Sequence, residues 1–415
     1  MLKKVLLFPG QGAQYTGMGK KLCEEFKTAS DIFDEASEAI SLDLKKMCFE
    51  GQNEELILTC NTQPAILTLS MAMFRVFMEE DNGTPDLLAG HSLGEISALA
   101  CAGAIEFADA VKIVRKRGEL MMEAVAPLVG AMAAVGTRDV NKINEICQEV
   151  SNNSEFAWIS NYNSRTQTVI SGTKGAIERA IQLLDMENIH SKQLNVGTPF
   201  HCILMKPAAE QFQVELSNYT FHDLKYPVLS NVTANLYNGK EDIIKNLTSQ
   251  IVMPVQWVRS MDYLKLFKIE YGIEIGPGNV LKNLMKTNHA EIKIFTYDNE
   301  ADIEEYRSFV KKSYIPFLSR SLGIAVSTRN LNWNSEEYRS GVVEPYNKIS
   351  ALQEKVEQED RRADFEEMKQ AVDMLKTMFQ TKKTSIEEQM ERFKELFQDT
   401  GTEQLFKDFD YSGLR

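Results

Sequence analysis

The 415-residue sequence has few of the features that mark membrane, secreted or metal-binding proteins. No apolar stretch approaches the ~20 residues that a membrane-spanning helix needs. The six cysteines form no Cys-x-x-Cys pair and no disulfide-framework spacing, and the sequence predicts no metal site. The apolar run at residues 5–8 stops at Pro9-Gly10, which is too soon for a signal peptide. These absences favour a cytoplasmic protein with reduced thiols.

Positive charge is also scarce, since 46 lysine and arginine residues stand against 59 aspartate and glutamate residues, for a net charge of -13. This balance argues against a nucleic-acid-binding protein and against a protein that binds anionic membranes. The hydrophobic content of 43% and the charged content of 25% are ordinary for globular proteins. A chain of this length is expected to hold two or three domains.

Glycine becomes scarce after residue 300. Residues 301–415 contain only four of the 23 glycines, but they hold 18 of the 46 basic residues and 22 of the 59 acidic residues. Two kinds of structure are therefore expected to meet near residue 300.

The first 300 residues alternate short apolar runs with helical periodicity, which is typical of an α/β domain with a mainly parallel sheet. The clearest strand candidates are residues 5–8, 87–89, 228–229 and 273–275. Between 127 and 196 the pattern changes to a β-α-β-α order that suits a small inserted domain of the ferredoxin-like type. Its expected strands are 130–135 and 168–171, and its expected helices are 141–150 and 174–185.

Beyond residue 300 the sequence predicts amphipathic helices. Apolar residues recur at three-and-four spacing in two stretches, 343–356 and 365–379. A third helix is expected to begin at Thr384 or Ser385, because an acidic residue follows three positions after each as a capping-box partner. We therefore expect a helical extension at 341–415, preceded by a linker at 299–340.

The strongest local motif is Gly90-His91-Ser92-Leu93-Gly94, a G-x-S-x-G sequence between a strand candidate and a helix-forming run. In a nucleophile elbow, the glycines permit a strained strand-to-helix turn that exposes the serine at the helix N-terminus. The free N–H groups and the dipole of that helix favour a developing oxyanion. Ser92 is therefore the candidate nucleophile.

A serine nucleophile needs a base that removes its proton, and the chain has only five histidines. His201 follows a rigid Gly-Thr-Pro-Phe turn that can hold an imidazole at the junction with the inserted domain. We expect His91 to be structural, because a strained elbow would turn it away from Ser92. His222 and His289 lie in polar, loop-like contexts, so we expect them at the surface.

Further motifs follow in a fixed order along the first 298 residues. They are Phe8-Pro9-Gly10-Gln11-Gly12-Ala13-Gln14, Gly90-His91-Ser92-Leu93-Gly94-Glu95, Arg117-Gly118, Gly130-Ala131-Met132-Ala133, Pro199-Phe200-His201, Asn231-Val232, Pro254-Val255-Gln256-Trp257 and Glu274-Ile275-Gly276-Pro277-Gly278. In these motifs and their order the sequence resembles the malonyl-CoA:acyl carrier protein transacylases. The resemblance implies an α/β-hydrolase-like catalytic domain at 1–126 and 197–298, with a ferredoxin-like insertion at 127–196.

The resemblance also implies a ping-pong reaction and assigns roles to single residues. Ser92 would carry the acyl group and His201 would be the base, with its imidazole oriented by the backbone carbonyl of Gln250 instead of a carboxylate. The backbone N–H groups of Gln11 and Leu93 would form the oxyanion hole. A thioester has a good leaving group, so a dyad can suffice. The family implies malonyl-CoA as substrate and no permanently bound cofactor.

The resemblance makes Arg117 the residue that determines which class of acyl group is bound. A planar guanidinium can bind the free carboxylate of a malonyl group bidentately. The alternative is that Arg117 lies on a solvated helix face, because Lys112, Arg115 and Lys116 surround it in the sequence. These three neighbours form a local basic patch, which would face either solvent or the acidic carrier protein and coenzyme A phosphates.

Two positions beside the dyad bear on selectivity. Phe200, which precedes His201, and Leu93, which follows Ser92, resemble the malonyl-type pattern of polyketide relatives and not the methylmalonyl-type pattern. Phe200 would narrow the space around the malonyl α-carbon. We therefore expect selectivity for malonyl.

Two segments beyond residue 300 resemble the linkers that follow discrete, trans-acting acyltransferases of polyketide assembly lines. They are residues 325–333 and 341–346. The helices after them would then dock on a polyketide synthase or a carrier protein. The alternative is an extension that packs on its own catalytic domain or dimerises.

The sequence thus predicts an acyltransferase that moves malonyl from malonyl-CoA to the phosphopantetheine thiol of an acyl carrier protein, in polyketide assembly. One alternative is an editing acyl hydrolase of the same fold, in which water releases the acyl group. Arg117 argues against it, because neutral acyl chains gain nothing from a buried guanidinium. A second alternative is a non-catalytic docking protein, which the intact Ser92, His201 and Gln11 disfavour.

Overall fold

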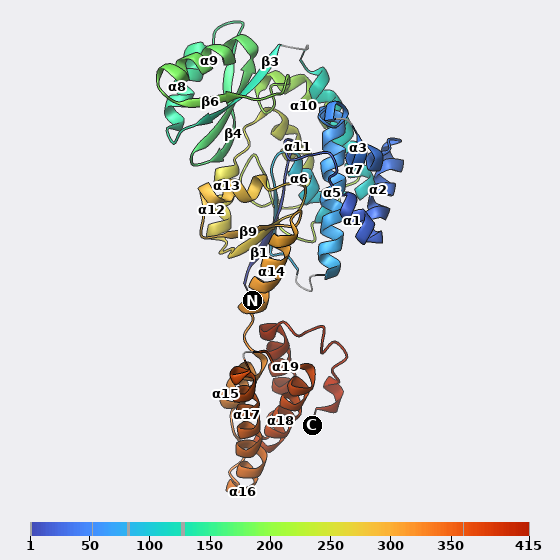
Figure 1. Ribbon diagram of the computed structural model, residues 1–415, viewed down its shortest axis with the longest axis vertical. Helices are drawn as coiled ribbons and strands as arrows, with labels where there is room; N and C mark the ends of the chain where they lie inside the picture. The colour runs from blue at the N-terminus through green and yellow to red at the C-terminus, as the bar shows by residue number, and fades with distance from the viewer. Residues whose placement is uncertain (1, 52, 81–83, 126–128, 360, 415) are drawn as a thin grey trace. The chain divides into compact units, whose positions relative to one another are not determined.

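The computed structural model describes residues 2–51, 53–80, 84–125, 129–359 and 361–414. Its contacts divide the chain into two compact units, Leu2–Glu305 and Tyr306–Arg415 (Figure 1). Across the described residues, no helix has the length and apolar character needed to cross a membrane. The domain boundary expected between 126 and 127 falls outside the described residues.

A five-stranded parallel sheet forms the centre of the Leu2–Glu305 unit. Its strand order is β7-β2-β1-β8-β9, and each neighbouring pair is parallel. The first four of these strands are buried along their whole length, which accounts for their apolar runs. All four predicted strands are confirmed, whereas β9 was not predicted. The strands are β1 (Lys4–Phe8), β2 (Leu87–Gly90), β7 (Val228–Leu229), β8 (Tyr271–Glu274) and β9 (Lys293–Thr296).

Helices cover both faces of this sheet (Figure 1). Val5 and Leu7 of β1 share a buried cluster with α12 and α13 on one face. On the other face, Phe8 contacts Phe74 of α5, as the alternation of side chains along a strand requires. The helices of this unit are α1 (Lys20–Glu25), α2 (Lys27–Ile40), α3 (Leu44–Glu50), α4 (Asn53–Leu56), α5 (Thr59–Glu80), α6 (Leu93–Cys101), α7 (Phe107–Glu123), α10 (Lys206–Leu216), α11 (Ile243–Val252), α12 (Trp257–Leu266) and α13 (Val280–Asn288), with short 3₁₀ helices at Ile203–Met205 and Lys240–Asp242.

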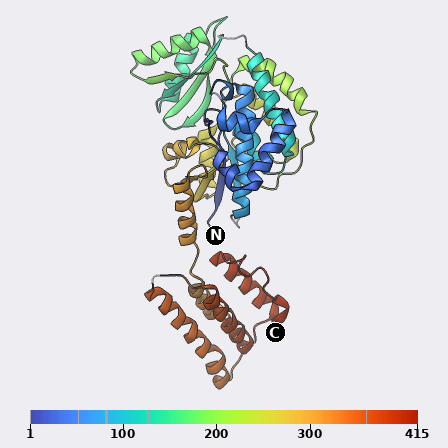
Figure 2. The same cartoon turned by 45° about the vertical axis from the view of Figure 1, so that its right-hand side comes forward.

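A second sheet, antiparallel and four-stranded, is inserted after α7, and Figure 2 shows it with its two helices on one face. The chain order β3-α8-β4-β5-α9-β6 and the sheet order β4-β5-β3-β6 are those of a ferredoxin-like domain. The sequence analysis missed β4, which is rich in polar residues, and β6, an edge strand that is largely exposed. The elements are β3 (Gly130–Gly136), α8 (Val140–Val150), β4 (Ala157–Ser164), β5 (Gln167–Thr173), α9 (Lys174–Met186) and β6 (His190–Gln193).

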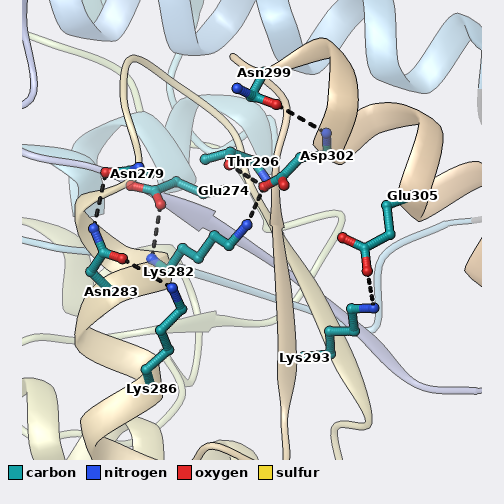
Figure 3. Close-up of polar contacts among 10 residues, drawn as sticks. All are labelled: Glu274, Asn279, Lys282, Asn283, Lys286, Lys293, Thr296, Asn299, Asp302 and Glu305. Carbon is teal, nitrogen blue, oxygen red and sulfur yellow. Dashed lines mark hydrogen bonds and ion pairs between the residues drawn. The ribbon is translucent and has the colours of Figure 1, made fainter.

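Helix α14 (Glu300–Ser313) begins in the first unit, where polar contacts fix its first turns (Figure 3). The Asp302 carboxylate accepts hydrogen bonds from the backbone N–H of Thr296 at 2.9 Å and pairs with Lys282. Lys293 of β9 pairs with Glu305 at 2.6 Å. These contacts tie the start of the helix to the edge of the parallel sheet.

The Tyr306–Arg415 unit is helical and has an aromatic core. Phe379, Phe393 and Phe397 are buried there, and the ring centroids of Phe379 and Phe393 lie 5.4 Å apart. The three predicted amphipathic helices are confirmed, and the third is capped at Ser385, whose hydroxyl accepts from the Glu388 N–H. The elements are α15 (Phe317–Ser327), α16 (Ser335–Tyr338), a π-helical turn at Arg339–Val343, α17 (Glu344–Gln358), α18 (Phe365–Lys382), α19 (Ile386–Thr400) and a 3₁₀ turn at Tyr411–Gly413.

The segment 299–340, which the sequence analysis treats as a linker, is largely helical in the structure. It contains α14, α15 and α16, and Phe317, Leu318 and Ile324 of α15 belong to the aromatic core. The helices of the extension therefore need α15 to complete their core, so the compact unit starts well before residue 341.

Candidate active site

Ser92 occupies the turn between β2 and α6, with the strained backbone angles φ 53° and ψ -107°. The two glycines of the motif are required by close backbone packing. A Cβ atom on Gly90 would lie 1.8 Å from the Gly94 carbonyl oxygen, and a Cβ on Gly94 would lie 2.0 Å from the Phe8 carbonyl oxygen. The predicted elbow is therefore present, and only glycine fits on either side of it.

The structure brings His201 to Ser92. The Ser92 Oγ lies 2.7 Å from His201 Nε2, and His201 Nδ1 lies 2.7 Å from the backbone oxygen of Gln250. A carbonyl oxygen can only accept, so Nδ1 carries the ring proton and Nε2 is left as the acceptor. The Ser92 hydroxyl therefore donates to His201, which is the arrangement that a general base requires.

The environment keeps His201 neutral. Burial, and secondarily the positive charge of Arg117, lower the pKa of the imidazole to about 3. His201 is thus unprotonated at neutral pH and ready to accept the serine proton.

The two residues of the predicted oxyanion hole, Gln11 and Leu93, both line the cavity that contains Ser92. Leu93 is the first residue of α6, so its N–H has no acceptor within the helix. Gln11 lines the same cavity as Ser92, in the loop after β1. That loop lies close to the elbow, since a Cβ on Gly10 would be 2.4 Å from the His91 carbonyl oxygen. The oxyanion hole at Gln11 and Leu93 stays a prediction.

Arg117 lies on the buried side of α7, only 2% exposed, so it is not on a solvated helix face. Its guanidinium donates to Gln63 Oε1 at 2.9 Å and to Gln250 Oε1 at 2.8 Å, and one nitrogen lies 3.3 Å from Ser92 Oγ. Burial lowers its pKa to about 10, so the group remains charged at neutral pH. Its Nε–H has no hydrogen-bond partner among the described residues.

A buried cation held by neutral amides is well suited to binding an anion. The protein oxygens in contact with Arg117 belong to amides and a hydroxyl, which orient the guanidinium without neutralising its charge. A small carboxylate in the adjacent space would therefore gain a charge-assisted hydrogen bond beside the nucleophile.

That adjacent space is a cavity of about 470 Å³, within the range of small-molecule sites. Its walls come from loops and helices beside the parallel sheet and from strands of the second sheet, and Phe200 is part of the lining beside His201. The lining residues include Gln11, Gln63, His91, Ser92, Leu93, Arg117, Met132, Asn161, Asn163, Val169, Phe200 and His201.

Two expectations about charged and polar residues are corrected. Arg115 pairs with Glu119 at 2.9 Å and Lys112 pairs with Asp109 at 3.2 Å, so local carboxylates offset much of the expected basic patch on α7. His289 is buried, with Nε2 2.7 Å from Asp262, and is not a surface residue.

No role was predicted for several polar residues of the site, although Asn231 and Glu95 belong to two of the family motifs in the sequence. Gln63 holds Arg117, Asn231 accepts from the Ser92 N–H at 2.6 Å, and Asn163 contacts the His91 ring at 2.9 Å. A signal was present for Gln63, because it is a polar residue in a helix that is otherwise mostly apolar and buried. Glu95, within an apolar stretch of α6, gave the same kind of signal.

Comparison with known proteins gives concordant matches. The family model described as acyl transferase domain matches residues 5–293. A Bacillus subtilis protein named malonyl CoA-acyl carrier protein transacylase is 37% identical over 396 residues, which are 92% of this chain and 98% of that relative. A protein of the same name from Bacillus subtilis strain 168 is 43% identical over 305 residues, which are 73% of this chain and 96% of that relative.

The Leu2–Glu305 unit, which we call the catalytic unit, also matches solved structures. One is described as a type II PKS acyl-carrier protein in complex with its malonyl-transacylase. It is 37% identical to this chain, has a TM-score of 0.71, and is matched over 73% of this chain and 98% of its own.

We expect the His201 imidazole to stay neutral when the pH falls from about 8 to about 5, because burial and Arg117 hold its pKa far below the ordinary value. NMR of the protein with isotope-labelled histidine measures this, and the signal that disappears in His201→Gln identifies the residue. A titration midpoint near the ordinary histidine pKa would contradict the prediction.

Proposed function

Because the chain belongs to the malonyl CoA-acyl carrier protein transacylase family, we propose that it transfers malonyl to the phosphopantetheine thiol of a carrier protein. Between the two halves of the reaction the malonyl group is bound to Ser92 as an ester. The reaction takes place in the cytoplasm. The observation that carries this assignment is the meeting of three groups in one cavity. Ser92 Oγ lies 2.7 Å from the neutral base His201 and 3.3 Å from the Arg117 guanidinium.

In the first half-reaction, Ser92 Oγ attacks the thioester carbonyl while His201 Nε2 takes the serine proton. The N–H groups of Gln11 and Leu93 stabilise the oxyanion of the tetrahedral intermediate. As this intermediate collapses, the C–S bond breaks and His201 returns its proton to the coenzyme A thiolate. The Gln250 carbonyl keeps the ring in the required tautomer throughout.

In the second half-reaction, the phosphopantetheine thiol takes the place of coenzyme A. His201 removes the thiol proton, the sulfur attacks the malonyl ester, and Ser92 leaves with the proton that His201 returns. The free enzyme is restored with no proton gained or lost. A neutral histidine therefore serves both halves of the cycle.

Arg117 would select the acyl group by pairing with its free carboxylate. Its Nε–H is free of protein partners in the described chain, and the guanidinium lies beside the nucleophile. Phe200 in the cavity wall would crowd a branched α-carbon and so favour malonyl over methylmalonyl. Neither an editing hydrolase nor a docking protein would need a buried cation in this position.

We further propose that the carriers belong to polyketide assembly, with the Tyr306–Arg415 unit docking on the synthase. The relative from strain 168 matches without this second unit. The alignment uses 73% of this chain and covers 96% of that relative. The other Bacillus subtilis relative extends over 92% of this chain and therefore includes a counterpart to most of the second unit. Because the catalytic unit is complete without the second unit, the presence of the second unit favours a role in binding a specific partner.

The surface of this unit supports a docking role. Trp333, between α15 and α16, is 90% exposed, and Val326 is 70% exposed. Exposed tryptophans are typical of protein interfaces.

Incubation with malonyl-CoA is expected to add one malonyl group to Ser92, and holo carrier protein is then expected to remove it as malonyl carrier. Intact-mass and peptide mass spectrometry follow both steps, with Ser92→Ala as the control. Release of the adduct as free malonate would support the hydrolase instead, and a protein that never forms an adduct would contradict both enzymatic roles.

Replacing Arg117 by Ala should lower kcat/KM for malonyl loading by about 100-fold, because a buried charge-assisted hydrogen bond is lost. Acetyl loading should be spared or improved, since acetyl has no carboxylate. Rapid-quench loading assays with both coenzyme A thioesters measure the two rates. An equal loss for both substrates would show that Arg117 does not bind the carboxylate.

Ending the chain after Ser313 keeps α14 but removes the helical core of the second unit. Loading of Ser92 should be unchanged, whereas transfer to a cognate polyketide carrier or synthase should slow by about 10-fold or more, as expected when a tether is lost. Trp333→Ala in the full chain should reproduce part of this loss, with the exposed Leu405→Ala as a matched control. Unchanged transfer in both variants would rule out the docking role.

A further inference from the structure

Glu95 is a fully buried carboxylate directly behind the catalytic serine. It is the third residue of α6, where all nine residues are buried. A carboxylate in such surroundings is costly unless hydrogen-bond donors surround it. Its presence one turn from Ser92 therefore needs an explanation beyond the packing of the helix.

Three donors from other parts of the chain converge on Glu95. Its Oε1 accepts from the Tyr237 hydroxyl at 2.5 Å, and its Oε2 accepts from Gln250 Nε2 at 2.6 Å and from the Asn231 N–H at 3.1 Å. Burial raises the pKa of Glu95, and these hydrogen bonds oppose that rise. The carboxyl group thus joins α6 to α11 and to the segment after β7.

The Gln250 amide has only one orientation that satisfies its neighbours. Arg117 can only donate, so it requires the Gln250 Oε1 on its side, 2.8 Å away. The amide nitrogen then faces Glu95 at 2.6 Å and the Ser92 carbonyl oxygen at 2.9 Å, both of which accept. Glu95, which makes the shorter of these two contacts, therefore acts together with the Ser92 carbonyl to hold the amide so that its oxygen faces the guanidinium.

Gln250 joins the two functions of the site. Its backbone oxygen orients His201, while its side chain holds Arg117. Across the described residues, no ion pair joins Glu95 to Arg117, although the charge of Glu95 opposes the fall in the Arg117 pKa that burial causes, and the neutral Gln250 amide bonds to both. A direct pair would place a competing carboxylate where the substrate carboxylate is expected, whereas the amide aims the guanidinium and leaves its charge available.

We propose that Glu95 is a positioning residue for substrate selection: by fixing the Gln250 amide, it holds Arg117 in the direction needed to bind the malonyl carboxylate. This inference rests on the proposed role of Arg117. It predicts an effect on the choice between malonyl and acetyl, which a purely structural role in the elbow would not produce.

Glu95→Met keeps a similar apolar volume but removes the acceptor of Gln250. We expect the ratio of kcat/KM for malonyl loading to kcat/KM for acetyl loading to fall by about 10-fold or more, with the loss mainly in malonyl KM. Glu95→Gln retains one acceptor oxygen for Gln250 and should restore most of the ratio. Tyr237→Phe removes the bond on the other carboxylate oxygen and should leave the ratio unchanged.

Thermal unfolding of each variant shows whether it is folded. If Glu95→Met does not fold, Glu95→Asp is measured in its place with the same readout. Aspartate keeps the charge, but its side chain is one methylene shorter and moves the acceptor oxygen away from Gln250. An equal loss for malonyl and acetyl would overturn the positioning role. Arg117→Ala, measured in parallel, separates the two proposals. If Arg117→Ala leaves the malonyl-to-acetyl ratio unchanged, Arg117 does not bind the carboxylate and its proposed role fails. If Arg117→Ala lowers the ratio and the Glu95 variants do not, only the proposed role of Glu95 fails.

Discussion

The site depends on backbone that packs too tightly around Ser92 to admit side chains. The loop after β1, the end of β2 and the first turn of α6 approach one another at Gly10, Gly90 and Gly94, where a Cβ would overlap main-chain atoms. Ser92 is therefore positioned by the ends of two neighbouring strands, β1 and β2, inside the parallel sheet. The same contacts bring the loop that carries Gln11 close to Ser92 and Leu93.

Around this backbone lies a network of buried polar side chains. Each buried charge is surrounded by groups of the matching hydrogen-bond type: amide oxygens face Arg117, and N–H and O–H donors face Glu95. A buried polar group is costly unless it is hydrogen-bonded, and of the Arg117 and Glu95 polar atoms only the Arg117 Nε–H lacks a partner among the described residues. It can therefore hold the Arg117 guanidinium and the neutral His201 imidazole within hydrogen-bond distance of the same serine.

The sequence predicted the parts of the structure that are local in the chain. The elbow at Ser92 and the caps of the C-terminal helices were predictable because the residues that build them are neighbours. His201 was found by elimination and resemblance, since only five histidines are present. Gln63 and Asn231 were not predictable in this way, because their roles arise only when α5 and the segment after β7 fold against Ser92. The edge strand β6 carries no apolar pattern to reveal it.

The connecting helix α14 has a consequence for how the two units fold. The first turn of a helix is the costly one, because it fixes several residues for a single hydrogen bond. In α14 that turn is built inside the first unit, where Asn299 caps it and Asp302 and Glu305 are paired. The residues from Tyr306 onward belong to the second unit and extend a helix whose nucleus already exists. Folding of the first unit thus supplies the nucleated turn from which the helix continues into the residues of the next unit.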